Sequence, residues 1–219
     1  PGEWSSVYQQ TYPTVEVPDF VECLRQFLDD SGAEELPQAV CIAAAGPVSN
    51  NTCVMTNLDW TVSGQEIHDK LNIKDGLVIN DFEAVGYGVP CLDKESLYTL
   101  NEGEYEADRP RDCIGAGTGL GQALIVYVNE TEGFKVIPSE GGHATYAPRG
   151  DRQRELQAWV EKTEGYCELE HLLCGSGLAR IHDFLQAQTP GVSLEREPQE
   201  ITAKGMLTWG VLTLAATQQ

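Results

Sequence analysis

The sequence is poor in basic residues. Its 219 residues include 14 lysines and arginines against 34 aspartates and glutamates, which gives a formal net charge of −20 at pH 7 with histidine neutral. A surface of this sign repels a phosphate polymer, so we expect no nucleic-acid partner. A nucleotide remains compatible with this charge, because a local nest of backbone N–H groups binds a small anion by itself.

Long apolar runs and paired cysteines are also missing. No apolar run approaches the ~20 residues that a membrane-spanning helix needs, so no membrane partner is expected. The seven cysteines are odd in number, and none forms a C-x-x-C pair. Several lie inside apolar runs, such as Cys41 in AVCIAAAG. We therefore expect buried free thiols in a reducing compartment, the cytoplasm.

Glycine is concentrated in one stretch, GAGTGLG at 115–121. Apolar segments at 112–114 and 122–128 flank it, and their composition predicts two strands joined as a hairpin. The lysine of the G-x-x-x-x-G-K-[ST] phosphate loop is absent. Glycines permit positive φ and close approach to a ligand, and the N–H groups of such a turn, with the Thr118 hydroxyl, suit an anion. An ordinary glycine-rich hairpin without a ligand is an equally good interpretation.

The first half of the chain alternates strand and helix patterns. Strands are predicted at 4–11, 39–45, 51–55 and 76–79, and helices at 18–30 and 61–71, the latter with Ser63 as a candidate N-cap. The wholly apolar run 39–45 is typical of a central strand that is covered on both faces. This alternation predicts an α/β layer up to about residue 110.

The second half begins after a polar connection at 93–111. A strand is predicted at 134–138, helices at 152–162, 169–173 and 177–188, and further helical segments at 198–204 and 206–219. The second half is therefore predicted to combine the glycine hairpin with a set of helices.

Three groups of residues could carry chemistry. Asn80–Asp81 follows a buried strand, at the edge where open α/β sheets bind ligands, but helix capping is the stronger interpretation from local sequence. Glu140 and His143 lie in EGGH, where an ordinary turn is the stronger interpretation; no cysteines are near enough to complete a metal site, so no metal ligand is assigned. Glu170, before the glycine pair of CGSG, is by itself a surface glutamate.

Taken together, the order and spacing of ND, GAGTGLG, EGGH and the glutamate before CGSG resemble the bacterial-type glucokinase family. The resemblance extends from about residue 12 to about residue 185, and includes Ala45-Gly46-Pro47, Met55-Thr56-Asn57, Trp60 and Ala147-Pro148. It implies the two-domain actin-like ATPase (ribonuclease-H-like) α/β fold, which hexokinases share, with a cleft between a small domain at 1–111 and part of a large domain at 112–219.

The resemblance also implies roles for individual residues. Asp81 would be the catalytic base, and the sugar ligands would be Asn80, Asp81, Glu140, His143 and Glu170. The hairpin would be a phosphate loop formed by Gly115, Gly117, Thr118 and Gly119. The implied reaction is transfer of the γ-phosphoryl group of ATP, with Mg²⁺, to the 6-hydroxyl of glucose, which is the first step of glycolysis.

The sequence departs from the family at both ends. The family's first phosphate loop, aspartate–glycine–glycine–threonine, and its C-terminal adenosine motif are not present, so we expect a truncated or gapped chain. A non-catalytic sugar sensor, or a kinase of a related hexose, therefore stays open as an alternative. A homodimer is an open expectation as well.

Overall fold

The computed structural model describes residues 5–55, 58–99, 101, 103, 104, 106 and 108–188. Contacts divide the chain into two compact units, Pro1–Glu102 and Gly103–Gln219. The predicted helices at 198–204 and 206–219 lie outside the described residues. Within the described part, no helix is both long enough and apolar enough to cross a bilayer.

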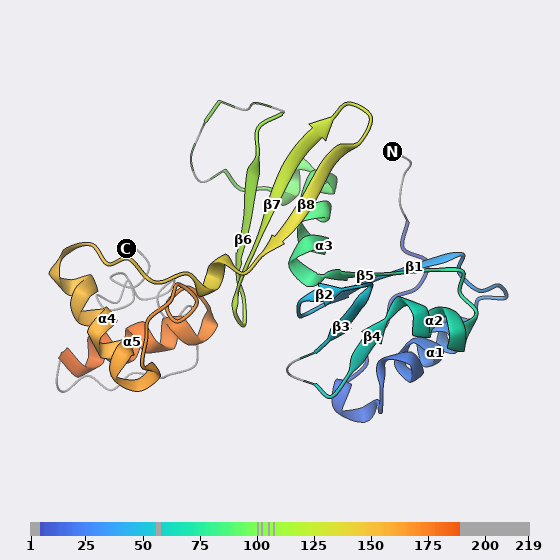
Figure 1. The fold of residues 1–219 in the computed structure, drawn as a ribbon, viewed down its shortest axis with the longest axis horizontal. Helices are drawn as coiled ribbons and strands as arrows, with labels where there is room; N and C mark the ends of the chain where they lie inside the picture. Colours follow the sequence, from blue (N-terminus) through green and yellow to red (C-terminus); the bar gives the residue numbers. More distant parts are fainter. Residues whose placement is uncertain are drawn as a thin grey trace. The chain divides into compact units, whose positions relative to one another are not determined.

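The first unit is built on a parallel strand pair. β1 (Ala39–Ala44) pairs with β5 (Asp75–Asn80) in register from Ala39↔Asp75 to Ala44↔Asn80. A small antiparallel sheet of β2 (Val48–Ser49), β3 (Thr52–Val54) and β4 (Thr61–Ser63) lies beside it (Figure 1). α3 (Asp81–Gly88) continues directly from β5, and the short 3₁₀ turns are η1 (Thr14–Glu16), η2 (Val89–Cys91) and η3 (Lys94–Ser96).

Two helices cover one face of the parallel pair. α1 (Phe20–Ser31) and α2 (Gly64–Leu71) lie side by side beneath β1 and β5 (Figure 1). Side-chain oxygens of Asp19 and Ser63 accept hydrogen bonds from the first turns of these helices, so the predicted Ser63 cap is confirmed. A core fills the space between the helices and the strands; it consists of Val21, Ile67, Leu71 and Ile73, with Val40 and Ile42 against it.

The opposite face of β1 and β5 differs from the prediction. Cys41 is exposed, and its register partner Leu77 is 53% exposed, so these strands are not covered on both faces. Double covering requires helices on both faces of a sheet, and α1 and α2 pack on the same face. The wholly apolar composition of 39–45 therefore does not report burial here.

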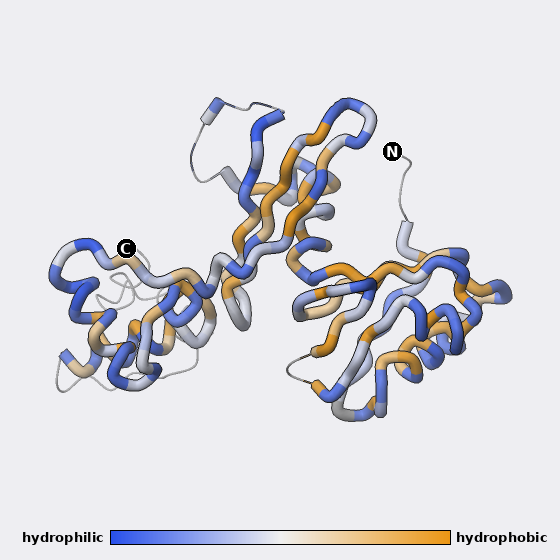
Figure 2. The backbone as a smooth tube through the Cα atoms, viewed as in Figure 1, coloured by the Kyte–Doolittle hydropathy of each residue, from blue (hydrophilic) through white to orange (hydrophobic). Residues whose placement is uncertain are grey.

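The second unit combines a meander with two helices. β6 (Arg111–Ala116), β7 (Leu120–Asn129) and β8 (Gly133–Ser139) form an antiparallel sheet, and Figure 2 shows the apolar stretch along β7. The 3₁₀ turn η4 (Gly141–His143) follows, and then α4 (Gly150–Glu164) and α5 (Gly175–Gln188). The helices enclose a core that consists of Leu156, Val160, Cys167, Leu172, Phe184 and Leu185.

Two predicted elements are wrong. Residues 5–11 form no strand, and a strand is stable only when a neighbouring strand accepts its hydrogen bonds. Residues 169–173 form a turn, in which Leu172 N–H and Leu173 N–H both donate to Leu169 O. The N–H groups that open this turn, Leu169 and Glu170, donate to the carbonyls of Ala144 and Gly142, so they are tied to the EGGH segment.

The cysteines are free, as predicted, but unevenly buried. Cys53, Cys167 and Cys174 are buried, whereas Cys41 and Cys91 are exposed. Burial raises the pKa of the Cys53 and Cys167 thiols, so these two groups stay protonated at neutral pH and act as small apolar side chains.

Candidate functional site

Asn80 lies where β5 ends and α3 begins. Its side-chain Oδ1 accepts hydrogen bonds from Phe82 N–H (2.9 Å) and Glu83 N–H (3.2 Å), so it is the N-cap of α3. Its Nδ2 donates to the carbonyl of Gly46 (3.1 Å), which ties the Ala45-Gly46-Pro47 segment to the start of the helix. The capping interpretation is confirmed for Asn80. A carboxamide has two N–H donors, so capping is compatible with a further bond to a ligand.

Asp81 follows as the first residue of α3 and is exposed. Its Oδ1 accepts from the N–H of Phe82 at 2.9 Å, which orients the carboxylate along the helix start. The carboxyl end of parallel strands is the edge at which open α/β sheets bind ligands. Asp81 is therefore an exposed carboxylate at the carboxyl end of a parallel strand.

The glycine hairpin lies where it was predicted, but its glycines do not adopt the positive φ angles that the sequence suggested. β6 and β7 pair up to Ala116↔Leu120, and Gly117 N–H donates to Gly119 O (2.9 Å) across the three-residue turn. None of these glycines has positive φ, which among described glycines occurs at Gly32, Gly133, Gly150 and Gly165. Space is open around Gly117, and Thr118 is exposed at the tip. The turn therefore stays accessible without left-handed residues.

Close packing explains the glycines of EGGH better than backbone conformation does. η4 lies against the start of β7, and a Cβ at Gly142 would run into the backbone carbonyl of Leu120. A Cβ at Gly141 would run into the side chain of Gln122. Only glycine permits this approach, and it places Glu140 and His143 beside the glycine hairpin.

Glu170 connects the hairpin to EGGH. Its Oε2 accepts a hydrogen bond from the N–H of Leu120 (2.7 Å), at the first residue of β7. Its own N–H donates to Gly142 O (2.9 Å), inside EGGH. Gly175 N–H, in CGSG, donates to Gly117 O (2.9 Å) at the hairpin turn. Three stretches singled out from the sequence thus meet in the second unit.

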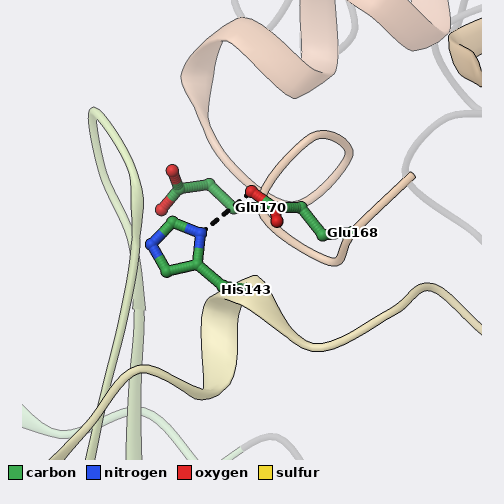
Figure 3. A group of neighbouring side chains, drawn as sticks. All are labelled: His143, Glu168 and Glu170. Atoms are coloured by element: carbon green, nitrogen blue, oxygen red, sulfur yellow. Dashed lines mark hydrogen bonds and ion pairs between the residues drawn. The ribbon is translucent and has the colours of Figure 1, made fainter. Parts of the chain in front are cut away.

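Glu168 belongs to this site and was missed from the sequence. Its Oε1 lies 2.9 Å from His143 Nδ1, the hydrogen bond drawn in Figure 3. Glu168 faces the EGGH segment because Thr145 and Glu168 form an antiparallel bridge. The sequence carried one signal for it, because Glu168 and Glu170 are two residues apart in ELE, the spacing that in an extended segment puts side chains on one face.

We call Glu140, His143, Glu168 and Glu170 the carboxylate–histidine cluster. Glu140 Oε2 lies 3.8 Å from His143 Nε2, so the imidazole has a carboxylate on each side. The hydrogen bond to Glu168 raises the pKa of His143; partial desolvation opposes this, and the charges of Glu168, Glu170 and Glu140 raise the pKa further. The cluster presents acceptors and one imidazole, the groups that bind the hydroxyls of a polyol.

Ligand atoms of His143, Glu168 and Glu170 lie within 4.8 Å of one another, a spacing that also suits a cation. Two of these atoms already have protein donors: Leu120 N–H bonds Glu170 Oε2, and His143 Nδ1 bonds Glu168 Oε1. The group is therefore a satisfied hydrogen-bond network, and we assign no metal to it.

The residues predicted for the site are divided between the two units. Glu140, His143, Glu170 and the hairpin lie together in the second unit, whereas Asn80 and Asp81 lie in the first. Each group is built by its own unit's strands and turns.

Two curated proteins are similar to this chain in sequence. The glucokinase of Trichormus variabilis is 36% identical over 210 residues, which are 95% of this chain and 59% of that protein. The glucokinase of Synechocystis sp. is 35% identical, over 93% of this chain and 58% of that protein. The chain thus spans about three fifths of the length of these curated relatives.

Two solved structures are similar to this chain in fold. The crystal structure of a glucokinase from an Antarctic psychrotroph has a TM-score of 0.78 at 25% identity and covers 95% of this chain and 64% of that one. A glucokinase from Balamuthia mandrillaris, crystallised with glucose, has a TM-score of 0.66 at 22% identity, over 90% of this chain and 59% of its own; at that identity the likeness supports the fold alone. The family model described as Glucokinase matches residues 2–217, and the chain therefore belongs to the glucokinase family.

Proposed function

We propose that the protein transfers the γ-phosphoryl group of ATP to the 6-hydroxyl of glucose, in the cytoplasm. The observation that carries the proposal is the bond from Leu120 N–H to Glu170 Oε2, at 2.7 Å. It joins the glycine hairpin, the proposed phosphate loop, to the carboxylate–histidine cluster, the proposed sugar site. Family membership supports the same assignment.

The proposed sugar ligands are Asn80, Asp81, Glu140, His143 and Glu170. The exposed carboxylates of Asp81 and Glu140 accept from hydroxyl groups, and bonds to charged acceptors are the stronger ones. The proposal requires both units to contribute ligands to one sugar. We further propose that they correspond to the small domain, 1–111, and part of the large domain, 112–219, of an actin-like ATPase with a cleft.

The proposed chemical step needs one base. The 6-hydroxyl oxygen attacks the γ-phosphorus, the bond from phosphorus to the β-phosphate oxygen breaks, and the hydroxyl proton passes to the carboxylate of Asp81. ADP leaves with the electrons of the broken bond. Positioning and electrostatic stabilisation supply most of the rate in reactions of this type.

The nucleotide would be held at the hairpin turn. Open space over Gly117 and the exposed Thr118 give room for a phosphate group beside backbone and hydroxyl donors. Mg²⁺ bound to ATP would offset the negative charge of the phosphates in this acidic protein. Gly115, Gly117, Thr118 and Gly119 are the proposed contact residues on this chain.

The test measures sugar binding and turnover separately. Calorimetric titration with glucose, mannose and glucosamine is paired with ADP release from MgATP in the presence of each sugar. We expect glucose to bind and to be turned over fastest. Binding without turnover would make the protein a sensor, faster turnover of another sugar would make it a different hexose kinase, and no sugar binding would overturn the proposal.

A further inference from the structure

A buried carboxylate lies between two imidazoles in the second unit. The side chain of Glu168 is 9% exposed, and its Oε1 lies 2.9 Å from His143 Nδ1 and 3.8 Å from His171 Nε2. A buried ionised carboxylate is stable only when donors satisfy it. The donor at hydrogen-bond distance is the Nδ1–H of His143.

The second imidazole, that of His171, also lies beside Glu168. His171 Nδ1 accepts the backbone N–H of Glu168 (3.4 Å), so in its neutral form His171 carries its proton on Nε2. This Nε2 is the nitrogen of His171 that lies 3.8 Å from Glu168 Oε1. The side chain of His171 is 12% exposed and stacks near Tyr166, so its ring is held by packing.

His143 differs from His171 because packing does not hold it. Its side chain is 53% exposed, so a free imidazole there would rotate and exchange tautomers. The bond to Glu168 removes both freedoms, because it fixes the ring and requires the proton on Nδ1. The other nitrogen, Nε2, then carries a lone pair and points away from Glu168 (Figure 3). Glu140 Oε2 lies 3.8 Å from this nitrogen.

We propose that Glu168 is a positioning residue for substrate recognition, which locks the His143 tautomer so that Nε2 accepts a hydrogen bond from one sugar hydroxyl. This inference rests on the proposed function, since it takes His143 as a sugar ligand. A fixed acceptor discriminates against a sugar that lacks the donating hydroxyl, because Nε2 is then left unpaired.

The proposal gives sugar binding a pH dependence. Protonation of His143 turns Nε2 into a donor, which faces Glu140 and no longer accepts from a hydroxyl. The charged groups around the ring are Glu140, Glu168 and Glu170, and all three raise its pKa. Glucose affinity should therefore fall as the pH drops through the pKa of His143. In a variant with an uncharged residue at position 168, the same fall in affinity should occur at lower pH.

The matched variants are Glu168→Gln, Glu168→Ala and a control, Glu155→Gln. Glutamine at position 168 keeps the shape of the side chain and one acceptor oxygen but removes the charge. Alanine removes the shape, the acceptors and the charge. Glu155 is an exposed glutamate of α4 in the same unit, bonded to Gln188, so its change leaves the cluster intact. Melting temperatures identify any variant that is simply less folded.

The experiment reads His143 directly and sugar binding independently. Two-dimensional ¹H–¹⁵N spectra of the imidazoles report the tautomer and pKa, and the protein has only four histidines to assign. Glucose dissociation constants are measured from pH 5 to 9. We expect an Nδ1–H tautomer in the wild type, a lowered His143 pKa in Glu168→Gln, and about tenfold weaker glucose binding in Glu168→Ala, with nucleotide binding unchanged.

Two results would overturn the proposal while the proposed function stands: an Nε2–H tautomer in the wild type, or glucose binding in Glu168→Ala equal to that of Glu155→Gln. Wild-type protein that binds no glucose would instead overturn the proposed function. The spectra, recorded without sugar, then decide by themselves whether Glu168 sets the tautomer of His143.

Discussion

The two candidate regions reach their geometry by different routes. At Asn80 and Asp81, the capping bonds are local, because side-chain oxygens accept from N–H groups one to three residues ahead. One longer bond joins Asn80 Nδ2 to the carbonyl of Gly46. In the carboxylate–histidine cluster the defining bonds join residues far apart in sequence, 50 residues for Leu120–Glu170 and 25 for His143–Glu168. The first region needs only a strand and a helix, whereas the second exists only when hairpin, turn and loop are all folded.

This difference separates two kinds of mutational effect. A change at Asp81 can alter chemistry while leaving the fold intact, because the hydrogen bond of its side chain is with the N–H of the next residue. A change in the second region should also disturb neighbouring segments, because Glu170 is bonded both to the hairpin at Leu120 and to the EGGH segment at Gly142. The following variants test that contrast, beginning with the largest expected effect.

Asp81→Asn should reduce turnover by about 10²–10⁴-fold, the usual effect of losing a general base. Asparagine keeps the side-chain oxygen that bonds Phe82 N–H, and Asn80 still caps α3, so stability should not change. Steady-state kinetics and thermal melting measure the two quantities. Wild-type turnover in this variant would leave Asp81 with a capping role only.

Gly119→Ala and Gly117→Ala form a matched pair in the hairpin. A Cβ at Gly119 would lie 2.6 Å from Glu170 Oε2, so the carboxylate must shift, and we expect its bond to Leu120 N–H to weaken or break. No atom lies within 4 Å of a Cβ at Gly117. We expect glucose binding to weaken about tenfold in Gly119→Ala.

In Gly117→Ala we expect glucose binding to stay unchanged and the effect to fall on the nucleotide. Titration of both variants with glucose and with MgATP makes the comparison. Equal glucose affinities in the two would show that Glu170 does not join hairpin and sugar site. Because Gly117 has open space and no positive φ, its sensitivity to substitution depends on ligand contact alone.

The sequence predicted local features well and distant ones poorly. Ser63 and Asn80 were identifiable as caps because the preference belongs to the residue and its next three neighbours. The hairpin was identifiable from its glycines and flanking strands. Glu168 was missed, since its role depends on the pairing of Thr145 with Glu168, and the spacing of ELE alone does not predict that long-range pairing.

The burial of side chains was also predicted poorly from the sequence. Composition predicted covering on both faces at Cys41, yet the residue is exposed, because composition does not say on which face neighbouring helices pack. The segment 169–173 has helical residues but forms a turn, and its first N–H groups bond the carbonyls of Ala144 and Gly142. In both cases tertiary contacts overrode local preference.

Asn80→Ala should lower the free energy of unfolding by about 1 kcal/mol, the usual effect of losing an N-cap. Asp19→Ala is the matched control, because Asp19 caps α1 in the same unit by the same kind of bond. Both variants should lose stability in urea unfolding, and Asn80→Ala should lose more because Asn80 Nδ2 also bonds Gly46 O. Only Asn80→Ala should also lose glucose affinity. If both variants lost glucose affinity, Asn80 would contribute to glucose binding only through the stability of the fold.

The smallest expected effect is on the pH dependence of stability, and it belongs to the carboxylate–histidine cluster. The pKa of His143 is raised in the folded protein, chiefly by its bond to Glu168, above the ~6.5 of an unfolded chain. The folded state therefore binds the proton more tightly, so this contribution is fully present below pH ~6.5 and is lost as the pH rises through the raised pKa. This contribution should be small, because solvent screens a half-exposed imidazole.

The free energy of unfolding, measured from pH 5 to 9, should show this decline in the wild type and in Glu155→Gln, but a weaker decline in Glu168→Gln. An identical slope in all three proteins would mean that the bond between Glu168 and His143 does not contribute to stability.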